Sequence, residues 1–270
     1  AELDGATIVI WTTTPWTLPG NRAISYGPDM DYVVIKVTSK TDESLAMVGE
    51  TMALGEALLA DVTTRAGITD FERVGSFKGD ALANTICHHP WFEKGYDFDI
   101  PLLSGDHVTT EAGTGFVHTA PGHGQEDYEV WLAHGHRQIP DTVGPGGLYY
   151  DHVPLFAGQH VFRADKPVCE ALIEAGALLA QGKLTHSYPH SWRSKAPLIF
   201  RNTPQWFISV EENDLRNKAL KEIDRVRWVP DSGYNRIRSM VESKPDWIVS
   251  RQRAWGVPIT VFVNKESGQP

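Results

Sequence analysis

The chain has 270 residues, 41% hydrophobic and 22% charged, which is an ordinary globular composition. No run approaches the roughly 18 apolar residues that a membrane-spanning helix needs, so we expect no membrane partner. Residues 1–5 have neither the basic end nor the apolar stretch of a signal peptide, which favours a cytoplasmic protein. The two cysteines, Cys87 and Cys169, are expected to be reduced thiols, and a single disulfide between them is the alternative.

The net charge of −9 is unevenly distributed along the chain. Residues 1–180 carry 10 Lys and Arg against 25 Asp and Glu, whereas residues 181–270 carry 15 against 9. Two differently solvated surfaces would give this asymmetry. Two bodies of different origin would also give it, and only the second would suit a phosphate backbone. We place the boundary near residue 180.

The first hundred residues are predicted to be mainly β-structure. β-branched and aromatic residues predict strands at 7–12 and 31–37, and a third strand at 44–47. Apolar residues at helical spacing predict a helix at 55–67. Turn-forming residues dominate 75–107, where we expect several short strands.

The later elements include more helices. A strand is predicted within 113–121, where it ends at a glycine-rich loop, and helices are predicted at 125–134 and 164–175. Beyond residue 180, short strands alternate with helical patches at 211–223 and 233–243. Strands outnumber helices before residue 160. This pattern predicts a mixed α/β fold with a compact β-barrel-like domain and peripheral helices.

The first motif that carries chemistry is Trp-Thr-Thr-Thr-Pro-Trp-Thr-Leu-Pro-Gly-Asn at 11–21. Pro15 and Pro19 force a turn, so that hydroxyl groups and freed backbone amides can converge on one point. A strand end with capping hydroxyls would have the same composition. The two tryptophans beside the hydroxyls suit a ligand with an aromatic or apolar part.

The second motif is Gly-Thr-Gly-Phe-Val-His-Thr-Ala-Pro-Gly-His-Gly-Gln-Glu-Asp at 113–127. Glycines such as Gly115 let the backbone approach a ligand closely. Asp127 lies in the first turn of the predicted helix, where complementing the helix dipole is its simplest role. A metal site of His118, His123 and Asp127 is an alternative, but the spacing of the histidines matches no standard signature, so we expect no metal. A Ser/His/Asp triad lacks support because no Gly-x-Ser-x-Gly elbow occurs.

Together, the two motifs are similar to the editing pocket of isoleucyl-tRNA synthetases. Segments at 186–193, 203–209 and 246–258 also resemble that family, in its order. The valyl and leucyl relatives carry Thr-Thr-Arg-Pro where this chain has Thr-Thr-Pro at 13–15. That difference favours the isoleucyl family, and the resemblance covers nearly the whole chain.

The resemblance implies an editing domain at 1–180, inserted into a nucleotide-binding catalytic core, and a return segment at 181–270 that leads into that core. The core signatures His-x-Gly-His and Lys-Met-Ser-Lys-Ser do not occur, so this piece is not expected to charge tRNA. Many family members have cysteines where this chain has Ser191 and Ser194. If those cysteines bind zinc elsewhere in the family, this chain lacks the zinc ligands at these two positions.

The implied reaction is hydrolysis of valine wrongly attached to the isoleucine tRNA. A hydrophobic pocket distinguishes one methylene by only about 10–200-fold, a range that comes from this family of enzymes. A second site that admits valine and excludes isoleucine solves that problem. The implied partners are the acceptor 3′ end of tRNA(Ile), valine or valyl-adenylate, and the rest of the synthetase. Editing is expected to need no cofactor, whereas the full-length enzyme uses ATP and Mg.

The resemblance also assigns roles to individual residues. Those expected to take part in catalysis are Asp127, Thr13 and Thr14. Those expected to bind the substrate are Thr12, Trp16, Thr17, Asn21, Gly115 and His118. In this assignment Asp127 binds the substrate's α-ammonium, the threonines hydrogen-bond the ester, ribose and water, and His118 limits the depth of the pocket.

No side chain in the two motifs is an obvious general base, so catalysis mainly by positioning is expected, with a substrate hydroxyl helping the water. Two other classes of protein stay open. One is a module that holds a tRNA 3′ end without hydrolysis, and the other is a metal-dependent hydrolase.

Overall fold

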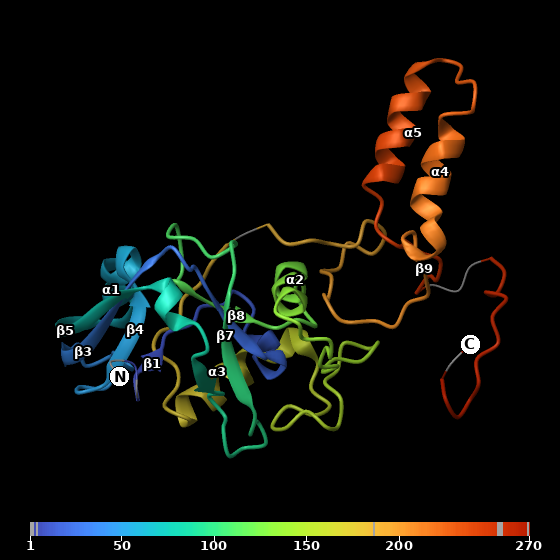
Figure 1. Ribbon diagram of the computed structural model, residues 1–270. Coiled ribbons are helices and arrows are strands. Elements are labelled where there is room, and N and C mark those ends of the chain that lie inside the picture. Colours follow the sequence, from blue (N-terminus) through green and yellow to red (C-terminus); the bar gives the residue numbers. More distant parts are fainter. Residues whose placement is uncertain (1–2, 4, 186, 253–255, 269) are drawn as a thin grey trace. The chain divides into compact units, whose positions relative to one another are not determined.

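The computed structural model describes the whole chain except residues 1–2, 4, 186, 253–255 and 269. Its contacts divide the chain into two compact units, Ala1–Asn202 and Thr203–Pro270 (Figure 1). The stretch 181–202 therefore belongs to the first unit by its contacts, although the charge pattern places it in the second segment. None of the helices in the described part of the chain has the length and hydrophobicity that crossing a bilayer requires.

The first unit contains two four-stranded sheets, and the first has the order β1-β4-β3-β5. Its strands are β1 (Thr7–Ile8), β4 (Thr51–Gly55), β3 (Asp31–Lys40) and β5 (Ile68–Lys78). β3 pairs antiparallel with β4 and β5, and β1 pairs parallel with β4. The short 3-10 helix η2 (Glu56–Leu58) leads into α1 (Leu59–Ala66), which ends at Gly67 with a φ of +65°.

The second sheet has the order β6-β7-β2-β8. Its strands are β6 (Ile86–His88), β7 (Asp99–Ser104), β2 (Ala23–Tyr26) and β8 (Phe116–Thr119). β2 pairs parallel with β7 and antiparallel with β8. Alternate residues of β3 serve two apolar clusters: Val33 and Ile35 pack in the cluster that includes α1, and Val34 packs with residues of the second sheet.

The segment after β1 connects the edges of the two sheets. The Val9 amide donates to the Ala53 carbonyl (3.2 Å), and the Trp11 amide donates to the Phe116 carbonyl (3.3 Å). Trp11 also forms an isolated bridge with Val117. In the described residues the sheets stay open and form no closed barrel, and the mixed α/β class is confirmed.

A third apolar cluster fixes the turn that follows β1. This turn is the 3-10 helix η1 (Pro15–Gly20), and its Trp16 and Leu18 pack with Val168 and Leu172 of α3 (Asp165–Glu174). The remaining elements of the unit are η3 (Gly79–Leu82), α2 (Gln125–Ala133) and η4 (Val161–Arg163). Because its apolar side is held in the core, η1 has a defined position, and so does the end of the three-threonine segment that leads into it.

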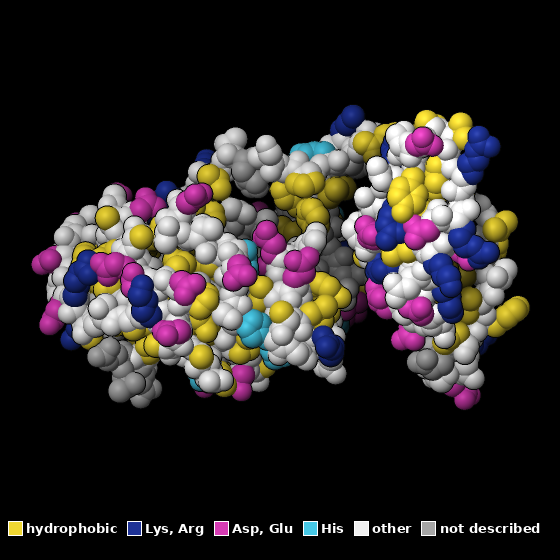
Figure 2. Space-filling model, turned by 45° about the horizontal axis from the view of Figure 1, so that its top comes forward, with side chains coloured by type: hydrophobic (Ala, Val, Ile, Leu, Met, Phe, Trp, Pro, Cys, Tyr) yellow, Lys and Arg dark blue, Asp and Glu magenta, His cyan; other side chains and the backbone are white. Residues whose placement is uncertain are grey.

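The second unit is a helical hairpin above a short ribbon. β9 (Phe207–Ile208) pairs antiparallel with β10 (Trp247–Ile248), and η5 (Glu212–Asp214) leads into α4 (Leu215–Ile223) and then α5 (Ser232–Glu242). No residue of α4 or α5 is buried. Large hydrophobic side chains are exposed on this unit, as the surface in Figure 2 illustrates.

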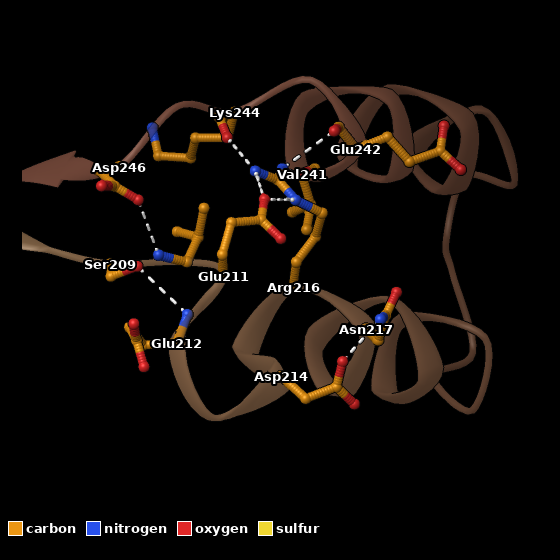
Figure 3. Close-up of polar contacts among 11 residues, drawn as sticks. Ser209, Glu211, Glu212, Asp214, Arg216, Asn217, Val241, Glu242, Lys244 and Asp246 are labelled. Atoms are coloured by element: carbon orange, nitrogen blue, oxygen red, sulfur yellow. Dashed lines mark hydrogen bonds and ion pairs between the residues drawn. The ribbon is translucent and has the colours of Figure 1, made fainter. Parts of the chain in front are cut away.

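Polar contacts of Arg216 join the two helices (Figure 3). Its guanidinium donates to the carbonyls of Val241 (2.6 Å), Glu242 (2.9 Å) and Lys244 (2.7 Å), and it forms an ion pair with Glu211. These carbonyls stand at the C-terminal end of α5, where a helix leaves carbonyl groups without intrahelical partners. One side chain of α4 thus closes the end of α5.

The structure confirms most of the predicted elements and corrects one. The helices predicted at 55–67, 125–134 and 164–175 form, as do the two helical patches of the second unit. The strand predicted at 44–47 is wrong, because those residues lie in the loop between β3 and β4. Ser44 is held there through its hydroxyl, which donates to the Ala66 carbonyl.

Candidate functional site

The threonines of the first motif stabilise the η1 turn themselves. The Thr14 amide donates to Thr12 Oγ1 (3.1 Å), and Thr17 Oγ1 donates to the Thr14 carbonyl (2.9 Å). Thr12 and Thr14 are partly exposed, and Thr13 is exposed. Hydroxyl groups therefore stabilise the turn while these residues stay accessible to solvent, so the structural and ligand-binding interpretations are compatible.

His118 on β8 is buried between two residues of the η1 segment. Its Nδ1 lies 2.7 Å from Asn21 Nδ2, and its Nε2 lies 2.9 Å from Thr17 Oγ1. Asn21 Nδ2 is a donor, so Nδ1 accepts. Because the Thr17 hydroxyl proton goes to the Thr14 carbonyl, Nε2 carries the proton and donates to Thr17. The contacts therefore select one neutral tautomer of His118.

Burial reinforces this neutral state. It lowers the pKa of His118 to about 3, with smaller contributions from His89 and His123. A second proton on the ring would place an N–H against the Asn21 amide donor. Asn21 cannot easily turn its amide, because Nδ2 also donates to the Ala23 carbonyl (3.0 Å). The His118 ring is thus uncharged and held in place by hydrogen bonds at both nitrogens, so it is not suited to act as a general base.

Asp127 is attached to the end of the strand that carries His118. It lies in the first turn of α2, and its Oδ2 accepts from the Ala120 amide (2.8 Å). Burial raises the pKa of Asp127 to about 6, while the Ala120 amide and the nearby His107 favour the charged form. Asp127 as a whole residue is partly exposed. One carboxylate oxygen of Asp127 is held by an amide, and burial disfavours its negative charge. Such a carboxylate is suited to bind a cationic ligand.

Two other predicted residues have clear packing roles. Gly115 has a φ of +85°, and a Cβ there would lie 2.8 Å from the Gly55 Cα, so only glycine fits. Trp16 is buried in the third cluster, its amide donates to Asp165 Oδ1 (3.2 Å), and its ring meets His123 edge-on. Their substrate contacts stay predictions, whereas their support of the turn and of β8 is visible in the structure.

His123 also has protein partners at both ring nitrogens. Nε2 lies 2.7 Å from Thr142 Oγ1, and Nδ1 lies 2.9 Å from the Phe200 carbonyl. Within the described ranges, no three His, Cys, Asp or Glu side chains are grouped as metal ligands would be. The alternative of a metal site at His118, His123 and Asp127 gains no support from this geometry.

Two residues outside both motifs belong to the surroundings of the site. Asp165 accepts from the Trp16 amide across 149 positions of sequence, and no local pattern predicts so distant a contact. His107 influences the charge of Asp127, and its Nε2 is buried without a hydrogen-bond partner among the described residues. Its only sequence signal is a histidine in the turn after β7.

Comparisons with known proteins identify the family that the chain resembles. The model of the family "tRNA synthetases class I (I, L, M and V)" matches residues 15–269. The isoleucine–tRNA ligases of Bradyrhizobium diazoefficiens and Caulobacter vibrioides are 49% and 50% identical to the chain. Each match covers 98% of this chain but only 29% and 30% of the relative. The chain therefore spans about 30% of the length of these curated relatives.

A solved structure supports the fold. The crystal structure of GlLeuRS-CP1 matches 69% of this chain and 87% of its own, with a TM-score of 0.50 and 13% sequence identity. At that identity the likeness concerns the fold alone. The family model covers most of the sequence, including both motifs from Pro15 onward. The chain therefore belongs to the class I tRNA synthetases of the I, L, M and V group, and its relatives at about 50% identity are isoleucine–tRNA ligases.

Proposed function

We propose that this chain is an editing hydrolase, which removes valine from mischarged valyl-tRNA(Ile) as the proofreading part of an isoleucine–tRNA ligase. One observation carries the proposal. The threonine turn is joined to His118 on β8, and the same strand leads to the amide that anchors Asp127. Two motifs separated by about a hundred residues thus meet at β8. Together they supply threonine hydroxyls, the uncharged His118 ring and the Asp127 carboxylate.

Asp127 is proposed to bind the α-ammonium of the aminoacyl ester. The Ala120 amide engages one carboxylate oxygen and leaves the other for the ligand. A charge-assisted contact at this position would also orient the scissile carbonyl. With a pKa of about 6, Asp127 is mostly ionised at neutral pH.

The ester is proposed to lie against the hydroxyls of Thr12, Thr13 and Thr14. These hydroxyls can donate to the carbonyl oxygen and accept from a water molecule. His118 supplies no base, because both of its nitrogens are engaged and its pKa is low. Catalysis by positioning is the mechanism these residues support, and we propose that it needs no cofactor, ATP and Mg serving the full-length enzyme.

Selectivity for valine is proposed to depend on His118. Its ring is held from both sides by Thr17 and Asn21, so it cannot move aside for one more methylene. The proposed partners are the acceptor 3′ end of tRNA(Ile), valine or valyl-adenylate, and the rest of the synthetase.

The decisive experiment measures deacylation of valyl-tRNA(Ile) and isoleucyl-tRNA(Ile) by the 270-residue chain. We expect the valyl ester to be hydrolysed and the isoleucyl ester to be largely spared, with no effect of a chelator. His118→Ala should allow isoleucyl-tRNA to be hydrolysed as well. Equal rates on the two esters with the unaltered chain would refute the size selection. Binding without hydrolysis would instead identify a module that only holds the tRNA end.

A further inference from the structure

Arg22 is a half-buried cation for which the editing mechanism has no use. It follows Asn21 directly, and its amide donates to the Thr119 carbonyl (3.0 Å), which fixes the backbone against the end of β8. The guanidinium stacks on Phe98, with its central carbon 4.2 Å from the ring centroid. Through Nη1 it donates to the carbonyls of Asn21 and Pro19. No carboxylate pairs with it among the described residues.

The other donors of this guanidinium remain unused. Nε and Nη2 have no hydrogen-bond partner in the described part of the chain, and neither is sealed from solvent. These two nitrogens form the edge that grips an oxyanion through two parallel hydrogen bonds. Burial lowers the pKa of Arg22 to about 10, so the group stays cationic at neutral pH. An unpaired, partly desolvated cation is costly unless an anion joins it.

Arg22 lines a cavity of about 250 Å³. Tyr96, Phe98 and Pro154 give it aromatic and apolar walls. Most of its polar side chains are already engaged: the Tyr96 hydroxyl donates to the Pro154 carbonyl, Thr142 Oγ1 bonds His123, and His152 Nε2 bonds the Asp141 carbonyl. The free charges in the lining are therefore Arg22 and the exposed carboxylate of Asp141.

We propose that Arg22 and this cavity bind the phosphate group of a nucleotide. The guanidinium edge supplies two donors for phosphate oxygens, and the aromatic and proline walls suit the attached nucleoside. A bare inorganic ion would leave much of the cavity unfilled. The nucleotide can be free in solution or be part of an RNA end, and both share this chemistry. The site adjoins η1, whose Pro19 lines the cavity, but it contains none of the threonines proposed to bind the ester, so its test does not depend on the editing reaction.

Adenosine monophosphate is the first probe, titrated into the 270-residue chain while NMR chemical shifts of the residues around Phe98 are followed. Arg22→Gln should weaken binding by about tenfold or more, because it removes charge-assisted hydrogen bonds. Arg73→Gln is the matched control, since Arg73 is an exposed arginine paired with Glu56, and it should leave the affinity unchanged. Asp141→Asn should tighten binding, because it removes a negative charge from the lining.

A second titration with an RNA trinucleotide ending in CCA separates the two sources. Tighter binding of the RNA than of the mononucleotide assigns the site to an RNA end, and the reverse assigns it to a free nucleotide. Absence of binding by the unaltered chain would overturn the proposal, and so would shifts that map away from Phe98. If Arg22→Gln fails to fold, as its melting curve would reveal, then Asp141→Asn decides. An affinity unchanged by Asp141→Asn would show that the phosphate does not occupy this cavity.

Discussion

The two units of the chain are stabilised by different kinds of interaction. In the first unit, apolar side chains such as Tyr32, Trp91 and Phe116 are fully buried in three clusters. In the second, α4 and α5 bury no residue, and one arginine makes many of the contacts between them. Apolar burial is not weakened by electrostatic screening, whereas partly exposed ionic contacts are. The unit that carries the candidate site is therefore the one that can hold its geometry by itself.

The two units also differ in how much apolar surface they leave exposed. The second unit exposes Phe207, Trp247 and Phe262, with 55%, 53% and 95% of their surfaces accessible. Large exposed apolar surfaces commonly mark interfaces. Because the chain spans about 30% of its relatives, we propose that the remainder of the synthetase covers these side chains.

The largest expected effect is the loss of editing in Asp127→Ala and Asp127→Asn. Removing a charge-assisted contact to the ammonium should slow valyl-tRNA deacylation by about 10–200-fold, and misplacement of the ester should add to this. Glu126→Gln is the matched control, because Glu126 is an exposed carboxylate in the same turn of α2. Near-normal hydrolysis by Asp127→Asn would exclude the ammonium role and leave only the contact with the Ala120 amide.

A large but local effect is expected from Arg216→Met. It removes hydrogen bonds to three carbonyls and the ion pair with Glu211, so the α4–α5 hairpin should lose about 3 kcal/mol of stability. Hydrogen exchange should accelerate in α4 and α5 and stay unchanged in β2 and β8. Arg225→Met, which removes an exposed pair with Glu222, should have little effect. Equal destabilisation of both units would contradict the expectation that the first unit keeps its structure independently of the second.

The pH dependence of Asp127 should have opposite signs for activity and stability. Its pKa rises from 3.8 when unfolded to about 6 when folded, so the folded state holds the proton more tightly. Between these values stability should fall as the pH rises, by about 1–2 kcal/mol after solvent screening. Deacylation should rise as the pH passes through about 6, since the ammonium needs the ionised carboxylate. Chemical denaturation at several pH values, with Asp127→Asn as reference, tests the stability term.

The smallest effect is expected from ending the chain after Asn202. The first unit should melt as it does in the full chain, within about 0.5 kcal/mol, because no cluster residue is removed. Ending it after residue 180 should cost more, about 1–3 kcal/mol, since Ile199 packs on the third cluster and the Phe200 carbonyl bonds His123. Equal stability of the two truncated chains would favour the boundary near 180.

Local sequence patterns predict some elements of the fold and miss others. The helix at α1 is evident because its apolar residues recur on one face and Gly67 ends it. The strand β4 was hidden because its buried residues, such as Met52 and Leu54, gave no clean alternation and preceded a helix. At the site, the motifs identified Thr17, Asn21 and His118, but their mutual hydrogen bonds depend on the pairing of β2 with β8. Such long-range pairing leaves no trace in local periodicity.

The hydrogen bonds of His118 also constrain how the substrate range of such a pocket can change. The position must accept a proton from Asn21 and donate one to Thr17. Glutamine and asparagine can do both through one amide, whereas alanine and valine can do neither and would leave buried donors and acceptors unpaired. A variant that widens the pocket with an apolar residue should therefore lose stability unless Asn21 and Thr17 change with it. In engineered or diverging relatives, these three positions are expected to be replaced as a set.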